Sequence, residues 1–355
     1  MKVVLLAPTP PPYGGIQSWT MRMLSASLKD GWTVAVVDEK AIGKREIFGK
    51  SGRRNLFEEI RRSVTIWHKL IVELRDPEAR VVQSCIPSTT FAMMREYVCA
   101  LITRRRKRKF ITHFRCTVPN LTQSSFGKMM LKRLCAKSDL ILSLNEQTSS
   151  FLRGLTDTPI RLVPNFVSPS ELNERYVVRE EIKTVLYVGG IVELKGVKDC
   201  VDVAASFPDI SFRFVGKGDD SIESYARSKH VDNAVFVGPL DHEAVKEEMG
   251  KADLFLFLSR FRGEGFSNAL CEAMAAGLPC IVTDWAANAD MIRPDGGAVV
   301  ALHDIKAVEN AIKALSDKSI RERCSEANIR KVKAEYLEPI VLDQYVDVYN
   351  KLMNA

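Results

Sequence analysis

The amino-acid sequence predicts an α/β protein with two doubly wound domains in tandem, each built on a parallel sheet. Short apolar runs alternate with segments whose apolar residues recur at helical spacing, the pattern of a parallel sheet covered by helices on both faces. The alternation stops at a proline-containing stretch near the middle of the chain and then restarts. The length of 355 residues also suits two domains rather than one or three.

The first half of the chain contains six strand candidates. A buried strand is predicted at 3–7, and a helix is predicted over 16–28, with Gly31 just past its end. The other strand candidates are 33–38, 81–85, 110–113, 140–144 and 161–163. Helical patterns lie between most of them, so the strands are expected to be parallel.

The segment 164–183 breaks this pattern with two prolines and a charged stretch, and we interpret it as an interdomain linker. The alternation then resumes, with strand candidates at 184–188, 211–215, 234–237, 254–258 and 280–283, and the chain ends in a helical pattern. Ligands of such sheets bind outside the carboxyl ends of the strands, so two facing sheets would enclose an interdomain cleft.

Composition excludes several protein classes. With 46% hydrophobic and 27% charged residues, the chain is neither disordered nor collagen-like. No apolar run approaches the ~20 residues that span a bilayer, and the apolar start at 3–7 stops at Pro8, too early for a signal peptide. The eight cysteines form no CxxC pair and no cluster with metal-ligand spacing. We therefore expect reduced, mostly buried thiols and a cytoplasmic protein.

Charge differs between the two halves. Of the formal net charge of +7, residues 1–170 carry +15 and residues 171–355 carry −8. A basic half suggests an anionic partner such as nucleic acid, acidic lipid headgroups or a phosphorylated substrate. No nucleic-acid recognition motif accompanies the charge, so nucleic acid is the weaker candidate.

Two glycine loops suit anion binding. Gly14-Gly15 precedes the first helix, whose N-terminus offers N–H groups to an anion, although a tight turn explains the pair equally well. Gly189-Gly190 is followed by Lys195 just before a second helix. A lysine beside a helix N-terminus is unfavourable, because the helix dipole is positive at that end, unless an anion binds between the lysine and the helix. The alternative is an ordinary surface lysine. Neither loop is GxGxxG, which argues against a dinucleotide oxidoreductase.

The third loop, after the strand at 254–258, contains the most specific motif. Ser267-Asn268 has the character of a helix start, and Gly277 with Pro279 that of its end. Glu264 lies in the loop and Glu272 about one turn into the helix. Their carboxylates can accept hydrogen bonds from sugar hydroxyls, while the amides around 266–268 hold phosphate. The alternative, a solvated Glu272, is weakened by its apolar neighbours.

This motif, Glu264 and Glu272 with seven residues between them and then "AMAAGLP", strongly resembles the retaining glycosyltransferases of family four. Those enzymes have the GT-B fold, two Rossmann-like domains that face a nucleotide-sugar cleft. Further segments resemble the family along nearly the whole chain: "PPYGGIQ", "FITHF", "VPNFV", "FRFVGKGDD", "VFVGPL" and "KADLFLFLS". The resemblance implies an N-terminal acceptor-side domain over 1–165 and a C-terminal nucleotide-sugar domain over 166–339. A final helix over about 340–355 would cross back onto the N-terminal domain.

The resemblance also implies residue roles. Glu264 would bind hydroxyls of the donor sugar, Glu272 the ribose, and Lys195 the diphosphate, where it would stabilise the leaving nucleotide. His113 would reach the donor sugar from the end of its strand, although a structural histidine is the alternative there. The remaining donor-binding residues would be Gly14, Gly15, Gly190, Gly216, Leu240, Arg262, Gly265, Phe266, Ser267 and Asn268. The chain has no D-x-D triplet, and the family generally needs no metal, so we expect none.

One departure from the family pattern leaves a second hypothesis open. The family usually has an arginine in the turn of the second loop, where this chain has Gly190-Ile191. We hypothesise that Arg262 compensates. The leading prediction is a metal-independent retaining glycosyltransferase of bacterial-type polysaccharide biosynthesis (capsule, exopolysaccharide or O-antigen). The alternative is a non-catalytic GT-B scaffold of a glycosyltransferase complex.

The basic half suggests where the acceptor lies. Residues 104–109 are six consecutive cations, Arg53-Arg54 and Arg61-Arg62 add charge, and 128–137 resembles an amphipathic surface helix. We hypothesise that the N-terminal domain docks on the inner face of the cell membrane to reach a lipid-linked acceptor. The alternative is a solvated loop and an ordinary half-buried helix.

Overall fold

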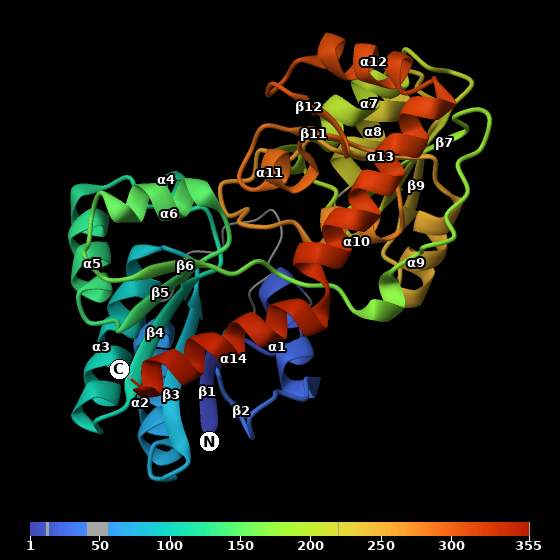
Figure 1. The fold of residues 1–355 in the computed structure, drawn as a ribbon. Coiled ribbons are helices and arrows are strands. Elements are labelled where there is room, and N and C mark those ends of the chain that lie inside the picture. Colours follow the sequence, from blue (N-terminus) through green and yellow to red (C-terminus); the bar gives the residue numbers. More distant parts are fainter. Residues whose placement is uncertain (12–13, 41–55, 219, 355) are drawn as a thin grey trace. The chain divides into compact units, whose positions relative to one another are not determined.

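The computed structural model describes residues 1–355 except 12–13, 41–55, 219 and 355, so Arg53-Arg54 and part of the first glycine loop lie outside the described residues. The chain divides into two compact units (Figure 1). Unit 1 comprises Met1–Asn165, Arg262–Phe266 and Pro339–Ala355. Unit 2 comprises Phe166–Phe261 and Ser267–Glu338. Each unit contains its own six-stranded sheet.

The sheet of unit 1 is parallel throughout, in the order β2-β1-β3-β4-β5-β6. Its central strands β1, β3 and β4 are almost fully buried, as expected for a parallel sheet covered on both faces. The strands are β1 (Lys2–Ala7), β2 (Thr33–Asp38), β3 (Ala79–Ile86), β4 (Lys109–Phe114), β5 (Leu140–Ser143) and β6 (Ile160–Leu162).

Helices cover both faces of this sheet. They are α1 (Gly15–Ser25), α2 (Leu56–Glu73), α3 (Thr90–Arg105), α4 (Val118–Leu121), α5 (Ser125–Cys135) and α6 (Glu146–Arg153). Leu70 of α2, Met93 of α3 and Leu131 of α5 form one buried cluster with Val4 and Leu6 of β1. Because alternate residues of a strand point to opposite faces, the even-numbered positions of β1 lie against these helices.

The last helix of the chain, α14 (Glu338–Asn354), packs on unit 1 (Figure 1). The ring of Tyr349 packs against that of Trp32 at an interplanar angle of 48° with centroids 5.1 Å apart, and its hydroxyl donates to the side-chain oxygen of Gln83. The ring centroid of Tyr345 lies 6.0 Å from that of Trp19 in α1. These aromatic contacts are fully buried and bind the end of the chain to the first sheet.

The sheet of unit 2 is also parallel, in the order β12-β11-β10-β7-β8-β9. Its strands are β7 (Thr184–Val188), β8 (Ser211–Val215), β9 (Ala234–Gly238), β10 (Leu254–Phe257), β11 (Cys280–Thr283) and β12 (Gly297–Val300). The helices are η1 (Pro169–Glu171), η2 (Glu193–Lys195), α7 (Val197–Ala204), α8 (Asp220–Ser228), α9 (His242–Lys251), α10 (Asn268–Ala275), α11 (Asn288–Ile292), α12 (Ile305–Ala314), α13 (Lys318–Lys331) and the π-helical η3 (Val332–Tyr336).

Two features differ from the sequence prediction. Strand β12 was not predicted, because its four residues begin with glycine and carry no long apolar run. The segment 164–183 is more than a linker, because from Phe166 onward it packs as part of unit 2. Phe166, Val167, Val178 and Ile182 are buried, and Val167 pairs with Leu337 in a parallel bridge.

Among the helices of the described residues, none is both long and apolar enough to traverse a lipid bilayer.

Candidate functional site

The strand order of unit 2 reverses between β7 and β10, which are neighbours in the sheet although β8 and β9 separate them along the chain. Ligands of open parallel sheets bind at the carboxyl edge beside such a reversal. The loop after β7 carries Gly190 and Lys195, and the chain after β10 carries the Glu264–Glu272 motif. The second glycine loop and the glutamate motif therefore follow the two strands that flank the reversal.

Helix α10 begins and ends as the sequence predicts. Ser267 is its N-cap, and its hydroxyl accepts a hydrogen bond from the N–H of Leu270 at 3.3 Å. Gly277, with φ of +84°, follows the last helical residues. Leu270, Cys271, Ala273 and Met274 are buried, and Glu272 is partly exposed between them. The N-terminal amides of α10 thus lie where a phosphate would meet the positive end of the helix.

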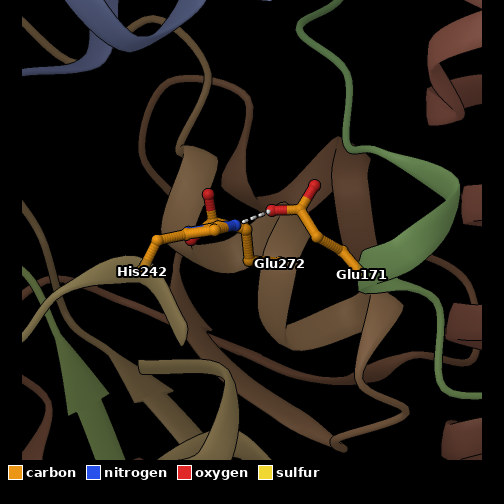
Figure 2. A group of neighbouring side chains, drawn as sticks. All are labelled: Glu171, His242 and Glu272. Carbon is orange, nitrogen blue, oxygen red and sulfur yellow. Dashed lines mark ion pairs between the residues drawn. The ribbon is translucent and has the colours of Figure 1, made fainter. Parts of the chain in front are cut away.

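Glu272 lies beside a histidine and a second glutamate (Figure 2). Nε2 of His242, the first residue of α9, lies 3.0 Å from Oε1 of Glu171 in η1. One ligand atom of each of these three residues lies within 4.8 Å of the others, a set that could also hold a divalent metal. Together with Val245, Lys246, Met249 and Ala276 they line a small hollow with room for about one water molecule.

Lys195 ends the short helix η2 directly before Gly196 and α7. Its ammonium lies 5.0 Å from the ring centroid of Phe261 and 5.7 Å from that of Phe257. Gly196 has φ of +74°, and a Cβ there would lie 2.0 Å from the carbonyl oxygen of Leu258. Glycine is therefore required for the turn that places Lys195 at the start of α7.

The loops after β8 and β9 continue the same edge of the sheet. The N–H of Gly216 donates to the carbonyl oxygen of Gly238 at 2.9 Å, and that of Gly189 donates to Val215 at 2.9 Å. The hydroxyl of Tyr187 donates to the carbonyl oxygen of Gly190 at 2.9 Å. Leu240 is half-buried immediately before the N-cap of α9. The hydrogen bonds hold three successive glycine turns side by side.

In unit 1, Gly14 is the N-cap of α1 and Gly15 its first residue, after β1. The strand order reverses at β1, with β2 on one side and β3 on the other. This loop therefore has the same relation to its sheet as the loops after β7 and β10 have to theirs.

His113 lies near the carboxyl end of β4 and is fully buried. Its Nδ1 lies 3.2 Å from Nε2 of Gln83, and its own Nε2 lies 3.3 Å from an Arg115 nitrogen. Its ring meets the edge of Trp19. Burial, and then the charge of Arg115, hold the pKa of His113 well below its usual value, so the imidazole is neutral. Its proposed contact with the donor sugar stays a prediction.

The predicted site residues are distributed over both units. The segment Arg262–Phe266, with Glu264 only 8% exposed, is grouped with unit 1, as are Gly14, Gly15 and His113. The other predicted residues belong to unit 2: Gly190, Lys195, Gly216, Leu240, Ser267, Asn268 and Glu272.

Two residues beside Glu272 were missed by the sequence analysis, although signals for both exist. His242 is the first residue of α9, four positions after the end of β9 and next to the N-cap Asp241, so it follows a strand-to-helix loop at the carboxyl edge of the sheet. Glu171 closes a capping box with Ser168, whose S-x-x-E spacing is readable in the sequence.

Residues 170–331 match the model of the family described as Glycosyl transferases group 1. The predicted resemblance to the glycosyltransferases of family four is confirmed. Among curated relatives, the chain is 27% identical over 223 residues to N-acetyl-alpha-D-glucosaminyl L-malate synthase of Bacillus anthracis, covering 58% of this chain and 57% of that protein. It is 32% identical over 181 residues to phosphatidyl-myo-inositol mannosyltransferase of Mycobacterium leprae, covering 49% of this chain and 48% of that protein. The matches thus span about half the length of these curated relatives.

Solved structures show the fold. Sucrose-phosphate synthase of Thermosynechococcus elongatus superposes with a TM-score of 0.80 at 17% identity, over 99% of each chain. The lipopolysaccharide outer core galactosyltransferase WaaB gives 0.71 at 18% identity, over 99% of this chain and 100% of that one. HepE of Anabaena, solved with UDP, gives 0.73 at 15%, with the same coverage. The predicted fold class, an α/β chain of the GT-B kind with two Rossmann-like parallel sheets, is confirmed.

Proposed function

We propose that the protein is a retaining glycosyltransferase that moves a sugar from a nucleoside-diphosphate sugar to a hydroxyl of a glycan or lipid-linked acceptor. One observation carries the proposal: Glu264 and Glu272 flank the capped N-terminus of α10, which follows a strand at the reversal of the sheet order. This part of the chain matches the family model of group 1 glycosyltransferases. That arrangement offers two carboxylates for hydroxyls and helix amides for phosphate.

In this proposal, each end of the donor has its own partners. Glu272 accepts hydrogen bonds from the ribose hydroxyls, and Glu264 accepts them from the sugar. Lys195 and the amides of Gly15 and of residues 266–268 bind the diphosphate oxygens. As the bond between the anomeric carbon and the phosphate oxygen breaks, charge grows on that oxygen. A lysine and helix N-termini stabilise it most at that moment.

The acceptor hydroxyl attacks from the face that the nucleotide leaves. Its oxygen forms the new bond to the anomeric carbon, and its proton passes to the departing phosphate oxygen. The configuration of the sugar is thereby retained. The positive field comes from Lys195 and the helix ends, so the reaction as proposed needs no metal.

The family usually has an arginine where this chain has Gly190-Ile191, and we propose that the guanidinium of Arg262 binds the diphosphate in its place. If so, Arg262→Ala weakens donor binding by about tenfold, the effect of losing ~1.4 kcal/mol. Isothermal titration with the donor measures this, and an unchanged affinity would reject the role of Arg262.

The relatives support a lipid-linked acceptor in envelope or polysaccharide assembly. One is named for phosphatidyl-myo-inositol, and another, 29% identical over 170 residues, is the lipopolysaccharide 1,6-galactosyltransferase of Escherichia coli. We propose for this chain a place in capsule, exopolysaccharide, O-antigen or glycolipid synthesis at the cytoplasmic face of the membrane.

The surface of unit 1 fits membrane docking. Helix α5 exposes Phe126 and Met129 beside Lys128, Lys132 and Arg133, and α3 ends at the exposed Arg104 and Arg105. Helix α2 exposes Phe57, Ile60 and Val64. Apolar side chains among cations suit an anionic leaflet, where each cation contributes about 1 kcal/mol. The protein should pellet with anionic liposomes at low salt and not with neutral ones, and absence of pelleting would reject docking.

A non-catalytic scaffold is the second candidate, and Gly190 in place of arginine favours it. The experiment that separates the two is thermal unfolding with a panel of nucleotides and nucleotide sugars, followed by assay of nucleotide release. A donor at 100 times its Kd stabilises the fold by about 2.7 kcal/mol. Stabilisation with slow nucleotide release supports the enzyme, and stabilisation without release from any donor or acceptor supports the scaffold.

A further inference from the structure

The main chain of the segment Arg262–Phe266 is anchored by two side chains of unit 1. The carbonyl oxygen of Glu264 accepts hydrogen bonds from the backbone N–H of Thr117 at 2.9 Å and from its hydroxyl at 2.8 Å. Nδ2 of Asn145 donates to the carbonyl oxygen of Gly265 at 2.9 Å and to the Thr117 hydroxyl at 3.0 Å. The Thr117 hydroxyl thus donates to Glu264 and accepts from Asn145.

This network is shielded from water. Thr117 is 0% exposed, Asn145 is 2% exposed and Glu264 is 8% exposed. Removing one partner from a buried hydrogen bond leaves the other unsatisfied and costs about 1–3 kcal/mol. The segment around Glu264 therefore has a strong preference for this one backbone position.

Close packing fixes the same segment independently of the hydrogen bonds. A Cβ added at Gly265 would lie 3.0 Å from the carbonyl oxygen of Arg115 and 3.0 Å from the backbone nitrogen of Cys116. That approach is tighter than ordinary van der Waals contact, so only glycine fits without displacement of the chain.

The two anchoring residues are themselves held by the fold. Thr117 is the N-cap of α4, just after β4, and Asn145 is the N-cap of α6, after the neighbouring strand β5. The Asn145 carbonyl Oδ1 accepts from the N–H of Thr148 at 2.8 Å. Adjacent parallel strands thus present both anchors at one edge of the sheet.

We propose that Thr117 and Asn145 are positioning residues that hold Glu264 where the donor sugar reacts, and so control the rate of transfer. This inference rests on the proposed function, since it concerns the carboxylate assigned to the sugar. Neither residue needs to touch the substrate. A displacement of about 1 Å in a reacting group can cost a factor of about 10² in rate.

Two variants break the anchor selectively. Thr117→Val removes the hydroxyl and keeps its shape, and Asn145→Asp keeps an oxygen that caps α6 while it removes the donor to Gly265. Each should lower kcat by about 10- to 100-fold and change the Kd of the free nucleotide much less, because Glu272 and Lys195 lie outside the anchored segment. Thr117→Ser should restore kcat.

The matched control is Thr103→Val, which removes a buried hydroxyl of α3 that donates to the carbonyl oxygen of Cys99 within the same helix. It should destabilise the fold to a similar degree without slowing transfer. Thermal unfolding of all variants shows whether they fold. Hydrogen exchange of peptides over residues 258–268 should be faster in Thr117→Val and Asn145→Asp and unchanged in Thr103→Val.

The outcomes separate the anchor from the proposed function. Wild-type kcat in both anchor variants would overturn the inference. If the wild-type protein transfers sugar from none of the donors, the proposed function fails. Hydrogen exchange then tests by itself whether Thr117 and Asn145 hold the segment Arg262–Phe266 in place. Unchanged exchange in both variants would then reject the anchor.

Discussion

Nε2 of His242 lies 3.0 Å from Oε1 of Glu171, and a carboxylate oxygen of Glu272 lies within 4.8 Å of both groups (Figure 2). Two carboxylates this close repel each other, and an imidazole beside them offsets that repulsion by donating a hydrogen bond. Since Glu272 is the residue assigned to the ribose, we expect His242 to keep its carboxylate in position for the nucleotide.

Replacement of His242 should therefore weaken nucleotide binding. We predict that His242→Ala raises the Kd of the nucleoside diphosphate by about 3- to 10-fold, equal to ~0.7–1.4 kcal/mol. His68→Ala, at an exposed position of α2, is the control. Isothermal titration measures both, and equal affinities in the two variants would show that His242 does not support Glu272.

Lys195 should act on the rate more than on folding. Lys195→Ala is predicted to lower kcat by about 10²–10³-fold, the usual effect of losing one group that stabilises developing negative charge. Lys198→Ala is a matched control, since that ammonium lies over the ring of Tyr225, 4.6 Å from its centroid. Steady-state kinetics would contradict the assignment if the two variants lost activity equally.

Burial of His113 predicts a pH dependence of stability. The folded state holds the pKa of His113 well below its usual 6.5, so the unfolded chain binds a proton that the folded chain does not. As pH falls below about 6.5, the free energy of unfolding should decrease by up to ~1.4 kcal/mol per pH unit from this group. Urea unfolding at pH 7.5 and 5.5 should show a smaller loss in His113→Gln, and an equal loss would assign the dependence to other groups.

Metal removal should leave transfer intact. The proposed reaction uses Lys195 and helix ends for the diphosphate, so EDTA should change kcat by less than about twofold. The assay should be repeated in His242→Ala, because Glu171, His242 and Glu272 form the one group of metal-ligating side chains among the described residues. Loss of wild-type activity with EDTA, restored by Mn²⁺ or Zn²⁺, would refute metal independence.

Much of the fold could be predicted because its determinants are local. The predicted strands at 33–38, 184–188, 211–215 and 280–283 agree with β2, β7, β8 and β11 in their bounds. Ser267 and Gly277 were recognised by the chemistry of helix caps, which depends on neighbouring residues alone. Strand β12 was missed because its pairing with β11, and not its own sequence, makes it a strand.

The site could be predicted only in part, because its supporting contacts are long-range. Glu264 was found from its motif, but the hydrogen bonds from Thr117 to Glu264 and from Asn145 to Gly265 join residues 147 and 120 positions apart. No spacing rule reveals such a pair. The contact of His242 with Glu171 likewise depends on how α9 and η1 pack within unit 2.

The central claim is that Glu264 acts on the sugar of a nucleoside-diphosphate donor. Its most direct test is the release of nucleoside diphosphate from a panel of UDP-, GDP-, ADP- and dTDP-sugars by the wild-type protein and by Glu264→Ala. We predict slow release from at least one donor by the wild type and a loss of at least about 100-fold in the variant, with nucleotide affinity retained. Release at the same rate by Glu264→Ala, or from no donor by either protein, would contradict the claim.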